Sequence, residues 1–447
     1  MKTSFLFFLK LFLLMLITSA AWAQRDDIQF FRKYDRTGIN VYETSKVDTI
    51  PYDGFKLRLG ANFTQGFQSL KHSNTSGIAL YKLGNGFPLA QANFNIDVQV
   101  IDGVRVSLVT YMASHHHNET WVKGGYFQID KVGFMKSELL NKLWKNLTLK
   151  IGHMEINYGD AHFRRSDGGN TFWNPFLDNN IIDAFTTEIG AELYWQKNGV
   201  IAMYGMTNGE IQGSVAGGSD RAPSIYGKVG YDKQLNEDVR VRITGSLLTK
   251  KSSISSTLFK GDRTGSNYQY VMEPAAGTLT ANAFAGRIDP NLKDNVTSFV
   301  INPFVKAYGF ELFGTYEAAQ GSTSAENGEV QYNATTPLLA KQDNRKFTQF
   351  EVDGLYRFGG QKQLYVGAKY NRVSADLAFW NTVNPIAVRT VSKVSIDRTS
   401  FGAGWFITSN ILIKGEYVTQ HYNDFPDGNI LTGGKFSGLV LQGSIAF

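Results

Sequence analysis

The stretch that decides the fold is Phe55-Lys56-Leu57-Arg58-Leu59-Gly60-Ala61-Asn62-Phe63. Its odd-numbered residues are apolar, and the residues between them are Lys, Arg, Gly and Asn. Because successive side chains of a strand point to opposite faces, the stretch has one apolar and one hydrophilic face. Such a strand is typical of the wall of a membrane barrel, apolar toward lipid and polar toward the lumen.

The same alternation recurs along the rest of the chain. It is found at 94–100, 104–108, 239–244, 351–358, 364–370, 411–417 and 439–447, and less clearly at 121–129 and 199–207. Short connections such as Asp102-Gly103 and Lys197-Asn198-Gly199 carry the residues of hairpin turns. The segment 133–146 is a longer connection that is expected to be helical.

Long connections alternate with the short ones. They fall near 68–90, 113–120, 155–186, 209–222, 250–295, 320–346, 374–395 and 423–434. Short periplasmic turns and long outer loops are typical of outer-membrane barrels. The predicted fold is therefore all-β, a transmembrane antiparallel β-barrel of about 16 strands with a water-filled channel. A soluble β-sandwich or a β-helix also alternates, but neither needs short turns at one end and long loops at the other.

The beginning of the chain resembles a secretory signal peptide. Lys2 precedes an apolar run over 5–17, and Ala21-Trp22-Ala23 has the small residues of a cleavage site. We expect 1–23 to be removed, 24–53 to be a periplasmic lead-in, and 54–447 to be the barrel. No later run reaches the about 20 apolar residues of a spanning helix, so the mature chain is either soluble or a barrel.

Composition excludes several classes of function. The absence of cysteine excludes disulfides, zinc–thiolate sites and cysteine nucleophiles. Without Lys2 and Lys10 of the signal peptide the formal charge falls from +6 to about +4, which does not indicate nucleic acid as a partner. No nucleophile elbow, zinc-helix motif or phosphate loop is present, so we expect no enzyme, no metal and no cofactor.

Several segments resemble the phosphate-selective porin O/P family of bacterial outer-membrane porins. They are 149–159, 190–199, 401–406, 414–417 and the closing strand 439–447. The terminal Phe447 resembles the assembly signal of outer-membrane proteins, whereas the proline of the family's Pro-Phe-Gly-like corner is absent near Gly159. The resemblance implies a passive diffusion channel, an inward-folded loop after the fifth strand, and a trimer. It does not by itself imply phosphate, because the loop lacks an arginine ladder.

A passive channel needs a constriction whose charges select ions. Basic rings favour anions and acidic rings favour cations. If the polar faces of the strands form the lumen, basic positions slightly outnumber acidic ones, which predicts a mild anion preference. The candidate wall residues are Arg58, Lys150, Arg240 and Arg242, together with the acidic Glu192. The alternative is that these charges pair with one another across the wall.

The connection 155–186 is predicted to fold inward and narrow the pore, since loops of this length usually have a function. Its candidate residues are Asp160, His162, Arg164, Arg165 and Asp167. The two arginines are the expected anion contact, and the acids, with Asp178 and Asp183, could neutralise them. The alternative is a loop tethered to the wall by ion pairs, with no role in selection.

Two further features have two interpretations each. Phe172, Trp173 and Phe176 are expected to pack the loop against the barrel, and a sugar-stacking platform is the alternative. His115-His116-His117 is either a solvated loop tip or a metal-binding tract.

The function predicted from these features is that of a porin in the outer membrane of a Gram-negative bacterium. It would be a passive channel for small hydrophilic solutes with a mild anion preference, with outer-membrane lipid, small anions and a homotrimer as its partners. One alternative is a structural or secretion-accessory barrel without an open channel, whose loops 250–295 and 320–346 bind other proteins. The other is a barrel hydrolase, for which no local signature is present.

Overall fold

The computed structural model describes residues 27–113, 119–167, 169–210, 222–252, 256–260, 267–282, 284, 286–323, 326, 342–383 and 386–447. The expected signal peptide and the His115–His117 tract lie outside these residues. No helix of the described residues has the length and apolar character that crossing a membrane requires.

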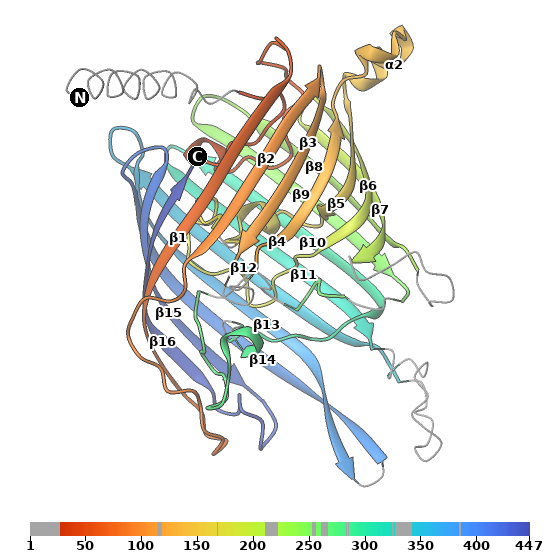
Figure 1. The fold of residues 1–447 in the computed structure, drawn as a ribbon. Helices are drawn as coiled ribbons and strands as arrows, with labels where there is room; N and C mark the ends of the chain where they lie inside the picture. Colours follow the sequence, from red (N-terminus) through yellow and green to blue (C-terminus); the bar gives the residue numbers. More distant parts are fainter. Residues whose placement is uncertain are drawn as a thin grey trace, which may run out of the picture.

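The described residues form sixteen strands, each hydrogen-bonded to the next in sequence (Figure 1). The strands are β1 (Lys56–Ser73), β2 (Gln91–Ile101), β3 (Val104–Met112), β4 (Trp121–Ile129), β5 (Leu147–Glu155), β6 (Thr187–Lys197), β7 (Val200–Glu210), β8 (Ser224–Gln234), β9 (Val239–Lys250), β10 (Asp294–Ala307), β11 (Phe310–Ser322), β12 (Arg345–Phe358), β13 (Leu364–Val383), β14 (Ile386–Phe406), β15 (Ile411–Asn423) and β16 (Lys435–Ala446). Antiparallel pairing of β1 with β16 closes the barrel. The predicted fold class is confirmed.

The two faces of the wall differ as the alternation predicts. In β12 the residues alternate between buried and exposed or half-exposed along the whole strand. Gln349, Glu351 and Asp353 face inward, whereas Phe350 and Tyr356 face outward. Apolar side chains are exposed on the outer face of nearly every strand, which is an arrangement that lipid stabilises and water does not.

The two rims of the barrel differ as well. The C-terminus, the short turns and α2 (Glu138–Trp144) lie at the upper rim of Figure 1, which we call the short-turn rim. Two turns there use left-handed residues, Asn198-Gly199 (φ 53° and 88°) and Tyr308-Gly309 (φ 52° and 100°). Positive φ at both central positions matches the twist of tight hairpins. The α2 helix begins at Ser137, whose side chain accepts a hydrogen bond from the amide of Leu140.

The connections differ from the predicted ones at two places. The segment 374–395 was predicted to be a loop, and this prediction is wrong: β13 and β14 continue through it as a paired hairpin that projects from the other rim (Figure 1). Every second residue is still apolar at Val373, Ala375, Leu377 and Phe379, so the strand pattern does not stop there. The predicted loop 68–90 begins at 74, because β1 continues to Ser73.

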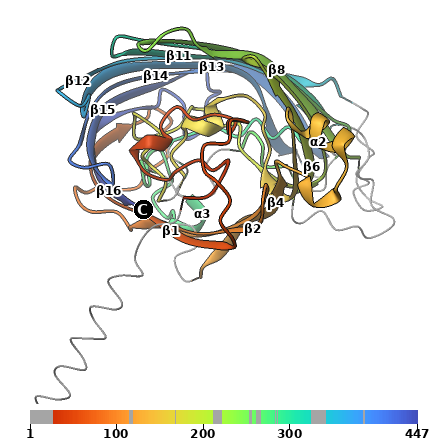
Figure 2. The same ribbon diagram turned by 90° about the horizontal axis from the view of Figure 1, so that it is seen from above.

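The lumen of the barrel contains three segments, seen from above in Figure 2. They are the N-terminal segment (27–55), the inward loop (156–186), and the described parts of 256–293, which include α3 (Leu279–Asn282). Most of their apolar side chains are buried. The lumen is therefore much fuller than the water-filled channel that a barrel of this size was expected to enclose.

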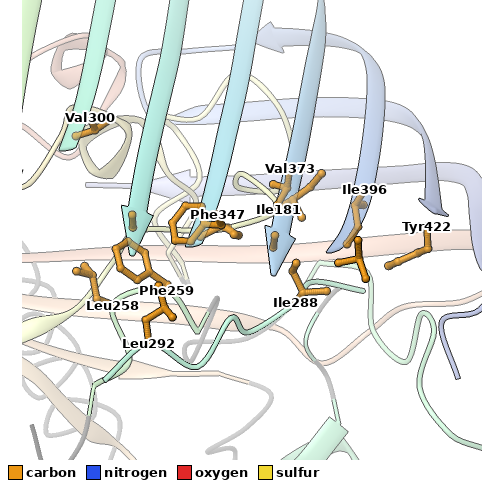
Figure 3. Packing of buried hydrophobic residues seen from close by; sticks show 14 of the residues in the cluster. Ile181, Leu258, Phe259, Ile288, Leu292, Val300, Phe347, Val373, Ile396 and Tyr422 are labelled. Carbon is orange, nitrogen blue, oxygen red and sulfur yellow. The ribbon is translucent and has the colours of Figure 1, made fainter. Parts of the chain in front are cut away.

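An apolar core lies where the inward loop and the 256–293 segment meet the wall (Figure 3). Ile181 of the loop and Leu258 and Ile288 of the longer segment pack with Val373 of β13 and Ile396 of β14. All five side chains are at least nine-tenths buried. Burial of apolar surface on this scale holds both segments in place, in the same way as in the core of a soluble protein.

Candidate functional site

The inward loop is anchored to the wall by a buried cluster of charges around Asp160. Its carboxylate accepts hydrogen bonds from Lys228 of β8 at 2.9 Å and from Arg242 and Thr244 of β9, each at 2.8 Å. Burial alone would raise the pKa of Asp160, but the charges of Lys228 and Arg242 outweigh it and hold that pKa well below its ordinary value. Asp160 is therefore an ionised anchor of the loop.

The two arginines of the inward loop also have carboxylate partners. Arg164 donates to Asp353 of β12 at 2.8 Å, and Arg165 donates to Asp183 at 2.6 Å. Arg165 also stacks on the ring of Phe185, with 3.8 Å between the guanidinium carbon and the ring centroid. These contacts are those of the tethering alternative, in which ion pairs hold the loop.

The remaining candidates of the loop make contacts of the same kind. His162 contacts Glu155 at 2.8 Å through Nδ1 and Asn157 at 2.9 Å through Nε2. Asp167 forms an ion pair with Lys123 of β4. Both residues line the cavity described below.

The three aromatic residues of the loop pack against other parts of the protein. The ring of Phe172 lies 5.8 Å from that of Phe406, and Trp173 stacks on Tyr34 at 6.3 Å. The guanidinium carbon of Arg32 covers Trp173 at 3.4 Å. The face of Trp173 is therefore occupied by residues of the N-terminal segment, as the packing interpretation requires.

The N-terminal segment contributes to the site, a role that its sequence did not reveal. Glu43 pairs with Lys228 at 3.2 Å and with Arg242 at 2.7 Å. Burial would raise the pKa of Glu43, but the charges of Lys228 and Arg242 outweigh it and lower that pKa to about 2. The one available signal is the surplus of basic residues on β8 and β9, which need counter-charges from elsewhere in the chain.

The candidate wall residues divide by their partners. Arg242 pairs with Asp160, Glu43 and Asp232, and Arg240 pairs with Asp232 at 2.6 Å. Glu192 accepts hydrogen bonds from the amide of Asn157 and the hydroxyl groups of Tyr194 and Tyr226. These charges are neutralised or fully bonded within the described structure.

Three basic residues of β1, β3 and β5 are neutralised less. Arg58 of β1 is 3% exposed, and none of its guanidinium nitrogens has a hydrogen-bond partner among the described residues. Arg105 of β3 donates to Gln128 at 2.8 Å, while its Nε has no partner among them. Lys150 of β5 lies 3.8 Å from Glu192 and 4.3 Å from the ring centroid of Tyr126. These three basic residues thus form a row on alternate strands, with the buried carboxylate of Asp97 on β2 between Arg58 and Arg105.

A cavity of about 240 Å³ lies beside two members of this row, Arg105 and Lys150, whereas Arg58 is not among its lining residues. Its walls are strands β1 to β6 on one side and the N-terminal segment and inward loop on the other. Polar residues dominate the lining, among them Asn93, Asn95, Arg105, Lys123 and Lys150. In the part of the chain that the structure describes, no group of three or more His, Asp or Glu side chains is placed to hold a metal ion.

Comparisons with known proteins do not assign the chain to a family. No family model matches the sequence, and no curated protein matches it. Among solved structures it is similar to OmpT of Vibrio cholerae (10% identity, 89% of this chain and 99% of that chain, TM-score 0.49). It is also similar to an anion-selective porin from Comamonas acidovorans (10% identity, 88% and 100%, TM-score 0.48) and to OmpF of Salmonella typhi (13%, 89% and 99%, TM-score 0.47).

The fold and the site define the general class of the molecule. It is a closed antiparallel barrel of sixteen strands with an apolar exterior and a charged interior. Membership of the phosphate-selective porin O/P family stays a prediction, because no family model matches.

Proposed function

We propose that this protein is a narrow diffusion channel of the outer membrane of a Gram-negative bacterium, which passes small hydrophilic solutes and mildly prefers anions. The observation that carries the proposal is the row of Arg58, Arg105 and Lys150 beside the polar cavity. Neither Arg58 nor Arg105 forms an ion pair with a carboxylate among the described residues, although Asp97 of β2 lies opposite Arg58 in the strand register. Basic groups that are not fully neutralised attract anions to a passage beside them. The Arg164–Arg165 pair is not the source of this preference, because carboxylates already neutralise both residues.

Location and partners are part of the same proposal. The apolar outer face supports outer-membrane lipid as the surroundings of the barrel, with the short-turn rim toward the periplasm. A homotrimer fits the predicted class of channel. Passive diffusion needs no catalytic group, so we propose no enzymatic activity.

The experiment that tests the proposal is reconstitution into a planar lipid bilayer under a salt gradient. We expect stepwise ohmic conductance with a reversal potential displaced toward that of the anion. The absence of conductance steps, or a preference for cations, would overturn the proposal.

The filling of the lumen favours a second candidate, a structural or secretion-accessory barrel without an open channel. The three internal segments lie within the lumen, and the apolar core of Figure 3 packs two of them against the wall. A silent bilayer recording together with the recovery of bound proteins from cross-linked outer membranes would establish this candidate over the first. Of its expected partner surfaces, the described parts of 256–293 are folded inward, and 327–341 lies outside the described residues.

A further inference from the structure

We propose that residues 27–53 are the size filter of the channel: they fill its mouth and leave a passage only along β1 to β6. This inference rests on the proposed diffusion function. It gives a role to a stretch whose sequence has no strand pattern, and it makes the filter a part of the chain that precedes the barrel.

The N-terminal segment forms a circuit around the inside of the short-turn rim. Near its start, Gln29 accepts a hydrogen bond from Gln99 of β2 at 2.8 Å. Farther along, the amide of Arg36 donates to the carbonyl of Ser409 at 3.0 Å, next to β15. Lys46 then reaches the other wall and donates to the carbonyl of Leu147 at 2.7 Å. The segment therefore contacts widely separated parts of the wall.

The circuit is closed on itself. The side-chain amide of Gln29 donates to the carboxylate of Asp48 at 3.1 Å and to the carbonyl of Ile50 at 2.8 Å. These bonds join the beginning of the segment to its end. The result is a compact body across the mouth, with side chains that point both outward to the wall and inward.

Charged contacts fix this body to the wall and to the inward loop. Glu43 holds Lys228 and Arg242, as described above, and Asn40 accepts a hydrogen bond from Arg164 at 2.6 Å. Arg32 donates to the carbonyl of Phe163 at 2.9 Å. Since buried charges that lose a partner are strongly destabilising, the segment and the loop hold each other in position.

The N-terminal segment also covers part of the row formed by Arg58, Arg105 and Lys150. The ring of Phe31 covers Arg58, with 4.3 Å between the guanidinium carbon and the ring centroid. Tyr34 lies beside it and donates to Asp97 at 3.0 Å. Phe31, Arg32 and Tyr34 all line the cavity. The segment thus limits the width of the passage and screens its most buried positive charge.

The test compares the full chain with a variant that keeps the predicted signal peptide and lacks 27–53. Removal of the segment widens the passage, so we expect the single-channel conductance to rise about twofold or more and larger solutes to pass. Heat modifiability in gel electrophoresis verifies that the variant barrel is folded.

The point variant Glu43→Gln weakens the contacts of the segment with Lys228 and Arg242 without a deletion. It is expected to give intermittent openings of high conductance. Asp427→Asn removes a carboxylate from an exposed position of the connection between β15 and β16, at the other rim, and should leave conductance unchanged.

A second readout uses the absence of cysteine from the chain. In an Arg58→Cys variant a membrane-impermeant thiol reagent should react slowly in the full chain and at least about tenfold faster after deletion of 27–53, because Phe31 no longer covers the site. Equal labelling, or equal conductance, with and without the segment would overturn the filter. A full chain that is silent and a deletion variant that conducts would support the segment's role but contradict the open channel proposed above. Silence of both proteins would contradict both proposals.

Discussion

Arg164 and Arg165 in the inward loop, and Arg58 and Arg105 in the wall, are four buried arginines of one lumen. The loop pair is held by Asp353 and Asp183, whereas Arg58 makes no described hydrogen bond and Arg105 bonds only an amide. The first pair therefore serves the architecture, whereas no ion pair among the described residues cancels the charges of the second pair. All four side chains are buried, and their partners decide their roles.

The largest expected effect comes from breaking a partnered arginine. Asp353→Asn leaves the charge of Arg164 buried without its carboxylate, and should cost about 3–5 kcal/mol of unfolding free energy. Urea denaturation of the protein in lipid vesicles measures it. The double variant Asp353→Asn/Arg164→Gln should recover most of the lost unfolding free energy. If the single variant is as stable as the original protein, the loop arginines do not differ from the wall arginines in their structural role.

The pH dependence of the N-terminal segment comes next. Because the pKa of Glu43 is lowered from 4.5 to about 2 in the folded protein, its stabilising contribution is fully present above pH 4.5 and is lost as the pH falls toward 2. Hydrogen exchange of 27–53, corrected for the intrinsic effect of pH, should accelerate in that range. In Glu43→Gln the exchange should be fast throughout, and a dependence that survives this substitution would assign the effect to another group.

Arg58 and Arg105, which form no ion pair with a carboxylate among the described residues, should affect selectivity instead of stability. Arg58→Gln/Arg105→Gln should lower the anion-to-cation permeability ratio by about threefold and change the unfolding free energy by less than about 1 kcal/mol. Reversal potentials give the ratio. Lys346→Gln, which removes an exposed charge on the outer face of β12, is the matched control.

Lys150 tests the comparison further, because a carboxylate neutralises it less than the loop arginines and more than Arg58 and Arg105. Its ammonium group lies 3.8 Å from Glu192, so part of its charge is already offset. Lys150→Gln should therefore shift the permeability ratio by less than about twofold. A shift as large as that of the double arginine variant would show that Glu192 does not neutralise it.

Much of the barrel could be predicted from the sequence, because the alternation of a two-faced strand is a local property. The strand predicted at 121–129, where the alternation is weak, begins and ends at the predicted residues in the structure. The helix predicted within 133–146 is present as α2. The same rule failed at 374–395, where charges and polar residues suggested a loop but alternation continued. Where a strand extends beyond the membrane, its alternation of apolar and polar residues becomes less regular, although the strand itself continues.

The site could be predicted only in part. Alternation correctly put Arg58, Arg242 and Glu192 on the inner face, since burial of every second residue is what the pattern encodes. It could not show which charges are paired, because Arg164 and Asp353 are far apart in sequence and meet only when the inward loop crosses the lumen. Residues 27–53 have no period at all, and their positions depend on side-chain contacts and on the backbone hydrogen bond from Arg36 to Ser409.

The N-terminal segment enters and leaves the lumen by the same rim, and β1 begins directly after it. None of the sixteen strand pairings uses its backbone. Its withdrawal through the short-turn rim would break side-chain contacts and the backbone hydrogen bond from Arg36 to Ser409, while every ladder of the wall stays intact. A pulling force applied ahead of residue 27 would remove the N-terminal segment from the lumen and leave the strand pairings of the barrel intact.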